Sequence, residues 1–113
     1  MAKKPETRFG DSIDPLLRNI PESVWFNIQQ LSIRGTPDRL GCISGTFIAL
    51  ELKASEKDYT KGIKGIDSRT KLQQHNINKI NNAGGYGTFL YPENWDEVYP
   101  VLIAISEGRW GDG

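Results

Sequence analysis

The segment that most constrains the fold is residues 46–53, TFIALELK. Its first part is almost wholly apolar, and its length and composition are typical of a buried β-strand. Side chains alternate between the two faces of a strand. One face is expected to carry Ile48, Leu50 and Leu52, and the other to carry Phe47, Ala49, Glu51 and Lys53. The strand therefore presents a carboxylate and an ammonium side by side, close to its C-terminal end.

The N-terminal half of the chain is predicted to form one helix and two more strands. Residues 9–20 repeat apolar side chains at helical spacing, and we expect Ser12 or Asp14 to cap this helix so that Pro15 falls in its first turn. Residues 24–33 are rich in β-branched and aromatic side chains, which indicates a strand, and a shorter strand is expected over residues 40–43.

The C-terminal half is predicted to add a helix, a strand and a final helix. Residues 70–83 have a helical pattern that stops at two glycines, and residues 86–91 form a short strand. Asn94 and Glu97 have the spacing of a capping box for a helix over residues 95–105. The predicted fold class is α/β: a small mixed sheet flanked by helices, built from helix, three strands, helix, strand and helix.

Two stretches carry no such pattern. Residues 1–8 are polar and are expected to be a loose N-terminus, and residues 54–69 are predicted to be a long flexible loop because glycines interrupt a polar sequence. The length suits one domain over residues 1–113. Because the chain has no apolar stretch of about 20 residues and no signal-peptide pattern, we expect a cytoplasmic protein with no membrane partner.

Composition excludes several function classes. The chain has 14 basic and 14 acidic side chains, one Cys and one His. Disulfide scaffolds and zinc sites built from Cys and His are therefore excluded, and a histone-like basic protein is excluded as well. Neutral net charge leaves nucleic-acid binding open, because a bound divalent cation reverses the local sign of the carboxylates that hold it.

A second carboxylate is expected to lie beside Glu51. Asp38 follows a Gly-Thr-Pro turn, and if residues 40–43 pair with residues 46–53 as a hairpin through Gly45, Asp38 returns towards Glu51. Two adjacent carboxylates repel each other unless one is protonated or a cation lies between them. A hard divalent cation with oxygen ligands, Mg²⁺ with Mn²⁺ as its substitute, is the economical solution.

Three segments together carry a family resemblance: RGTPD at 34–38, ALELK at 49–53 and LQQHNINKINNAGG at 72–85. In this order and separation they resemble the PD-(D/E)xK nuclease superfamily. Within it they are more similar to the virus-type replication-repair (VRR-NUC) branch, which includes small phage and bacterial Holliday-junction-resolvase-like enzymes. The resemblance implies a restriction-endonuclease-like core and a magnesium-dependent endonuclease acting on branched or otherwise structured DNA. A homodimer is a candidate assembly, since virus-type members often cut as dimers.

The resemblance also implies roles for individual residues. Asp38 and Glu51 match the two side-chain metal ligands, and the backbone carbonyl of Leu52 matches the third protein ligand. Lys53 matches the lysine that orients or helps deprotonate the attacking water. Gln73 matches the active-site glutamine of the helix that follows. The helical arc independently places Gln73 on the buried side and Gln74 outward.

The remaining expectations concern the first helix and the DNA contacts. The family's further acid aligns with Asp11, with Asp14 and Glu22 as competitors. Basic side chains near the motifs are the candidate DNA-binding residues: Arg34, Lys61, Lys64, Arg69 and Lys71. A catalytically silent nucleic-acid-binding module on the same fold is the alternative function.

Overall fold

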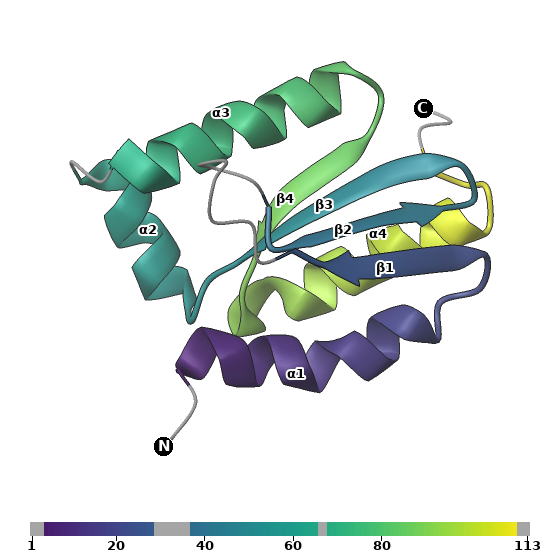
Figure 1. Cartoon of the computed structure of the whole chain (residues 1–113), viewed down its shortest axis with the longest axis horizontal. Coiled ribbons are helices and arrows are strands. Elements are labelled where there is room, and N and C mark those ends of the chain that lie inside the picture. The colour runs from purple at the N-terminus through teal and green to yellow at the C-terminus, as the bar shows by residue number, and fades with distance from the viewer. Residues whose placement is uncertain (1–3, 29–36, 66–67, 111–113) are drawn as a thin grey trace.

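The structure is a computed structural model, and it describes residues 4–28, 37–65 and 68–110 of the chain (Figure 1). Its elements, in chain order, are α1 (Pro5–Arg18), β1 (Ser23–Asn27), β2 (Arg39–Ile43), β3 (Thr46–Leu52), α2 (Glu56–Lys64), α3 (Ser68–Asn82), β4 (Tyr86–Leu90), a 3-10 turn (Pro92–Asn94) and α4 (Trp95–Ser106). The prediction of an α/β fold with a small mixed sheet flanked by helices is confirmed.

The sheet has the order β1-β2-β3-β4. The first two pairings are antiparallel, and β4 pairs parallel to β3 after the chain crosses over through α2 and α3. A parallel pair requires such a crossover, because the chain must return to the end of the sheet where the previous strand began. In Figure 1, α2 and α3 lie together on one side of the sheet, and α1 and α4 lie on the other.

The β2–β3 hairpin has the two-residue turn that the position of Gly45 indicates. Ser44 and Gly45 both have positive φ, at 47° and 86°, as a type I′ turn requires. This turn pairs Ile43 with Thr46 and Arg39 with Leu50. Continuing the register by one residue sets Asp38 opposite Glu51, as the hairpin prediction required.

Both faces of β3 are buried from Ile48 to Leu52. Ile48, Leu50 and Leu52 point into a core formed with α1 and α4, which includes Leu17 and Leu102. On the opposite face Ala49 and Glu51 are also buried, and Gln73 of α3 lies against Glu51. A charged residue is rarely buried unless it is paired, so the position of Glu51 marks a specialised environment.

Helix α1 begins earlier than predicted. It starts at Pro5, which occupies the first helical turn, and Pro15 lies inside the helix. Residues 5–8 are therefore helical, and the expectation that all of residues 1–8 are loose is wrong. A proline at N1 costs nothing because the first amides have no intrahelical acceptor, whereas Pro15 removes one hydrogen bond within the helix.

The prediction of a long flexible loop over residues 54–69 is also wrong. Residues 56–64 form α2, which begins at Ser55, where the side-chain hydroxyl accepts a hydrogen bond from the Asp58 amide at 3.1 Å. The sequence Ser-Glu-Lys-Asp is a helix N-terminal signal that its glycine-rich continuation obscured. Gly62 is buried because α2 packs closely against α3.

The remaining element boundaries are close to the expected ones, with two qualifications. Strand β1 ends at Asn27, and residues 29–33 of the predicted strand lie outside the described residues. The predicted capping box at Asn94 does not form: the Asn94 side chain accepts from the Tyr91 amide at 2.9 Å and so caps the 3-10 turn rather than α4.

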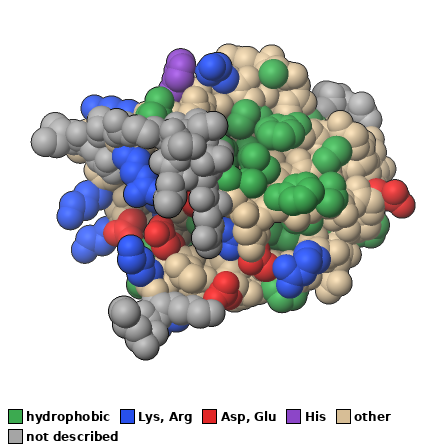
Figure 2. All heavy atoms as spheres, viewed as in Figure 1, with side chains coloured by type: hydrophobic (Ala, Val, Ile, Leu, Met, Phe, Trp, Pro, Cys, Tyr) green, Lys and Arg blue, Asp and Glu red, His purple; other side chains and the backbone are tan. Residues whose placement is uncertain are grey.

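Part of the sheet face that α3 covers is open over β1, β2 and the start of β3. Val24, Phe26 and Phe47 share this face by the strand register and are each about half exposed. Figure 2 shows hydrophobic side chains grouped on this side of the molecule, well away from the basic side chains on its left. No helix in the described ranges is long and apolar enough to span a bilayer.

Candidate active site

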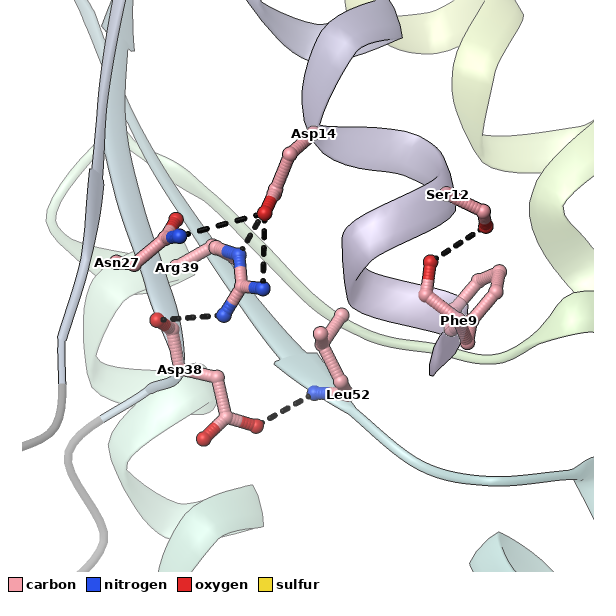
Figure 3. Close-up of polar contacts among 7 residues, drawn as sticks. All are labelled: Phe9, Ser12, Asp14, Asn27, Asp38, Arg39 and Leu52. Atoms are coloured by element: carbon pink, nitrogen blue, oxygen red, sulfur yellow. Dashed lines mark hydrogen bonds and ion pairs between the residues drawn. The ribbon is translucent and has the colours of Figure 1, made fainter. Parts of the chain in front are cut away.

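The centre of the candidate site is the pair formed by Asp38 and Glu51. The Asp38 amide donates to Glu51 Oε2 at 3.0 Å. The Leu52 amide donates to Asp38 Oδ2 at 2.9 Å, as Figure 3 shows. These two bonds continue the β2–β3 ladder past its last backbone pair. They fix both carboxylates at the end of the hairpin where the two strands separate.

Burial disfavours the charged form of both acids. It raises the pKa of Asp38, although the hydrogen bond from the Leu52 amide opposes that shift. Burial, together with the negative charge of Asp38, raises the pKa of Glu51 to about 8. Glu51 is only 3% exposed, so its charged form is costly here unless a cation compensates it. A group so perturbed, beside a second acid, is typical of a functional site.

The backbone carbonyl of Leu52 faces the same side as these acids. In an antiparallel ladder the amide and carbonyl of one residue point to the same neighbouring strand. The Leu52 amide points to Asp38, and the next amide, that of Lys53, donates to the Leu90 carbonyl on the opposite side at 2.9 Å. The Leu52 carbonyl is therefore directed towards Asp38, where the resemblance expects a backbone ligand.

Lys53 is held in a fixed position on the same face as Glu51. Its ammonium donates to Gln73 Oε1 at 3.1 Å and to Thr70 Oγ1 at 3.2 Å, and lies 5.6 Å from the centre of the Phe89 ring. Gln73 in turn donates through Nε2 to Glu51 Oε1. The Gln73 amide therefore accepts from the Lys53 ammonium through its oxygen and donates to the Glu51 carboxyl through its nitrogen.

The structure confirms that Gln73 points inward and Gln74 does not. Gln73 is 3% exposed, while Gln74 bonds Asn78 on the outer side of α3. Thr70, one turn before Gln73, is fully buried and was missed from the sequence. Its spacing of three residues from Gln73 on a helix is the signal that could have identified it.

A second helix contact fixes Thr70. A Cβ added at Gly62 would lie 2.5 Å from Thr70 Oγ1 and 3.0 Å from Thr70 Cβ. Only glycine at position 62 allows α2 and α3 to approach this closely. The backbone of α2 then packs against the Thr70 hydroxyl, which accepts a hydrogen bond from Lys53. Helix α2 therefore supports the site, which a mobile loop would not.

A cavity of about 540 Å³ opens beside Lys53. Lys53 and Thr70 line it together with Lys61 of α2 and Glu6 of α1. Glu6 was missed because the residues around it were expected to be loose. An acid from the first helix thus reaches the cavity next to Lys53, although it is not one of the three acids that the sequence suggested.

Those three acids have different surroundings. Asp11 is exposed on α1, and Glu22 is exposed beyond the helix, with a φ of 58°. Asp14 is buried and pairs with Arg39, the residue after Asp38 (Figure 3). The role predicted for Asp11 stays a prediction. Asp14 contacts Arg39, which is adjacent in sequence to Asp38.

Of the candidate DNA-binding residues, Lys61 lines the cavity beside Lys53. Arg34 lies outside the described residues, and the other four side chains are exposed: Lys61, Lys64, Arg69 and Lys71. The positive charge of Arg69 reaches Asp38 and Glu51, and lowers the pKa of both against the larger effect of burial. In Figure 2, basic side chains gather at this end of the molecule.

The acids available for metal binding are few. Within the described ranges there is no cluster of three or more His, Cys, Asp or Glu side chains that could hold a metal ion. Among the described residues, the candidate oxygen ligands at this site are the carboxylates of Asp38 and Glu51 and the Leu52 carbonyl. The chain matches no protein-family model, and it shows no significant similarity to curated protein sequences or to solved structures.

Proposed function

We propose that this protein is a metal-dependent DNA endonuclease of the PD-(D/E)xK type, in the VRR-NUC branch, with a restriction-endonuclease-like core. The observation that carries the proposal is the continuous set of contacts from Asp38 through Glu51 and Gln73 to Lys53. The four residues come from three separate segments, and they are the four to which the family resemblance assigns active-site roles. A solvated ion pair on a strand surface would not require this buried connection.

The donor set suits Mg²⁺, or Mn²⁺ in its place. Both prefer oxygen ligands, and two carboxylates with one carbonyl leave coordination positions for water and a phosphate oxygen. Asp38 Oδ2 accepts from the Leu52 amide, so we expect Asp38 Oδ1 to be the oxygen that binds the cation. A bound cation would displace the proton of Glu51 and supply Lewis-acid chemistry at the phosphate.

The chain's own residues would complete the site. The ammonium of Lys53 would stabilise negative charge that develops on the attacked phosphate, because Thr70 and Gln73 hold it in place beforehand. Gln73 would hold the Glu51 and Lys53 side chains at a fixed separation through its hydrogen bonds to both. Glu6 is a candidate for the first-helix acid of the family. The cavity beside Lys53 would receive the substrate strand. Cleavage of the family's type would leave 5′-phosphate and 3′-hydroxyl ends.

We predict that cleavage requires Mg²⁺ or Mn²⁺ and stops with excess EDTA. The purified protein would be incubated with linear, flapped and four-way DNA in each metal and in Ca²⁺, with the Asp38→Asn variant purified in parallel as the control for contaminating nucleases. Cleavage by wild type that persists in EDTA, or cleavage by Asp38→Asn at the wild-type rate, would contradict the proposal. DNA binding without cleavage in any metal would support the silent binding module instead.

We further predict that Lys61 and Lys64 bind phosphates of the DNA backbone. Removing one ammonium that binds a phosphate lowers the slope of log K against log salt by about one, so Lys61→Ala/Lys64→Ala is expected to flatten the slope by about two. The matched control removes Arg18 and Lys79, which are exposed at the ends of α1 and α3. Equal flattening in both double variants would mean that only net charge matters, and an unchanged slope would remove α2 from the DNA surface.

A further inference from the structure

A buried ion pair lies directly behind the proposed metal ligands, on the opposite face of the sheet from Lys53. Arg39 donates through Nε to Asp14 Oδ1 at 2.9 Å and through Nη2 to Asp14 Oδ2 at 3.2 Å. Asn27 of β1 donates to the same carboxylate at 3.3 Å. Figure 3 shows this cluster joining α1, β1 and β2 at one end of the sheet.

The pair is buried to a degree that requires an explanation. The side chains of Arg39 and Asp14 are only 12% and 10% exposed, against 64% and 53% for the surface pair of Arg109 and Glu107. Desolvation makes a buried pair weak evidence for stability, because apolar residues of similar volume often serve equally well. Such a pair is better explained by the geometry that its directional bonds impose.

Helix α1 is shaped to admit the guanidinium. A Cβ added at Gly10 would lie 2.5 Å from Arg39 Nη2 and 2.9 Å from Leu52 Cδ1. The absence of a side chain at Gly10 thus lets α1 contact Arg39 and the residue that bonds Asp38. One turn further along, Asp14 receives the fork of the guanidinium.

These interactions act on Asp38. Arg39 Nη1 donates to the Asp38 carbonyl at a long 3.4 Å, and the Ile28 amide donates to the same oxygen at 2.9 Å. Because residues 38 and 39 are adjacent, fixing the Arg39 side chain to α1 also limits rotation of the peptide that carries the Asp38 carboxylate. We propose that Asp14 and Arg39 are positioning residues that hold Asp38 at the distance from Glu51 and the Leu52 carbonyl that a shared cation needs.

This inference rests on the proposed metal-dependent function, but its structural part can be measured without metal or DNA. The Leu52 amide donates to the Asp38 carboxylate, whereas the neighbouring Lys53 amide donates to the Leu90 carbonyl. Hydrogen exchange at Leu52, compared with Lys53, therefore reports on the position of Asp38 in the folded protein.

The principal variant is Asp14→Leu/Arg39→Met, which replaces the pair by apolar side chains and leaves no unpaired buried charge. The matched control is Glu107→Leu/Arg109→Met, which removes the exposed pair. Arg39→Lys is the second variant, because it keeps the positive charge and removes the bidentate hydrogen bonding to Asp14. If the double variant does not fold, this variant tests the positioning role.

In the folded double variant we expect faster exchange at Leu52 with unchanged exchange at Lys53, and a Kd for Mn²⁺ raised about 10- to 100-fold with kcat lowered in proportion. KM for DNA should change little, because no group that binds the substrate is removed. A folded double variant with wild-type exchange at Leu52 and wild-type Kd for Mn²⁺ would overturn the inference. Altered exchange in a protein whose wild type neither binds metal nor cleaves DNA would support the positioning role and refute the proposed function.

Discussion

Replacing Lys53 by methionine is expected to lower kcat for DNA cleavage by about 10²- to 10³-fold, while Kd for DNA changes by less than about threefold. The ammonium acts where charge develops in the transition state, whereas binding is shared among many phosphate contacts. Methionine is preferred to alanine because it fills much of the space that the lysine stem occupies between Thr70 and Phe89. Single-turnover cleavage and equilibrium DNA binding measure the two quantities.

The control is Lys79→Met, which removes an exposed ammonium near the opposite end of α3. It should leave kcat unchanged. If Lys53→Met weakened binding as much as it slowed cleavage, Lys53 would be a phosphate anchor rather than a group that acts on the reacting phosphate.

The stability of the metal-free protein is expected to fall as pH rises from about 5 to 8. Burial and the charge of Asp38 raise the pKa of Glu51 from 4.5 to about 8. Below the lower value both the folded and the unfolded chain hold the proton. Between the two values only the folded chain holds it, so folding takes up a proton and becomes less favourable with rising pH. The expected decrease is on the order of 4 kcal/mol, from about 1.4 kcal/mol per pKa unit.

Glu51→Gln should remove most of this pH dependence and make the metal-free protein more stable than wild type at pH 8. Urea unfolding at pH 5, 6.5 and 8 measures the free energy of unfolding, with Glu97→Gln, an exposed acid on α4, as the control. Mg²⁺ should restore stability at pH 8 in wild type and not in Glu51→Gln, because only the charged carboxylate binds it. A free energy of unfolding that is constant from pH 5 to 8 in wild type would show that Glu51 is ionised in the folded protein.

The site's central geometry could be predicted because local rules determine it. A glycine turn sets the register of the hairpin, and the alternation of a strand sets the faces, so Asp38 had to return beside Glu51. The helical arc alone placed Gln73 inward, and the structure confirms it. These predictions depend only on residues that are close to one another in the sequence.

Other features depend on contacts between distant segments, and these were missed. Two glycines in a polar stretch, Gly62 and Gly65, indicate a loop when only the sequence is considered. The structure shows instead that Gly62 lies in a helix, where it packs against Thr70 of α3. Asp14 was considered as a helix cap and as a competitor to Asp11, but not as a partner of Arg39, since nothing near it in the sequence shows that Arg39 will enter the space left by Gly10. Glu6 was missed for a different reason: the start of α1 at Pro5 was not recognised.

The topology of the sheet also has a consequence for the order in which the site assembles during folding. The β2–β3 hairpin closes a short loop, whereas the parallel pairing of β4 waits for the α2–α3 crossover. Local contacts form at a lower entropic cost and so favour the early stages of folding. We therefore expect the two acids to meet before α3 brings Gln73 and Thr70 to Lys53, so that the early hairpin holds two carboxylates together without that support. Because burial is the main cause of the raised pKa of Glu51, we expect this carboxyl to take up its proton only when α3 covers it, late in folding.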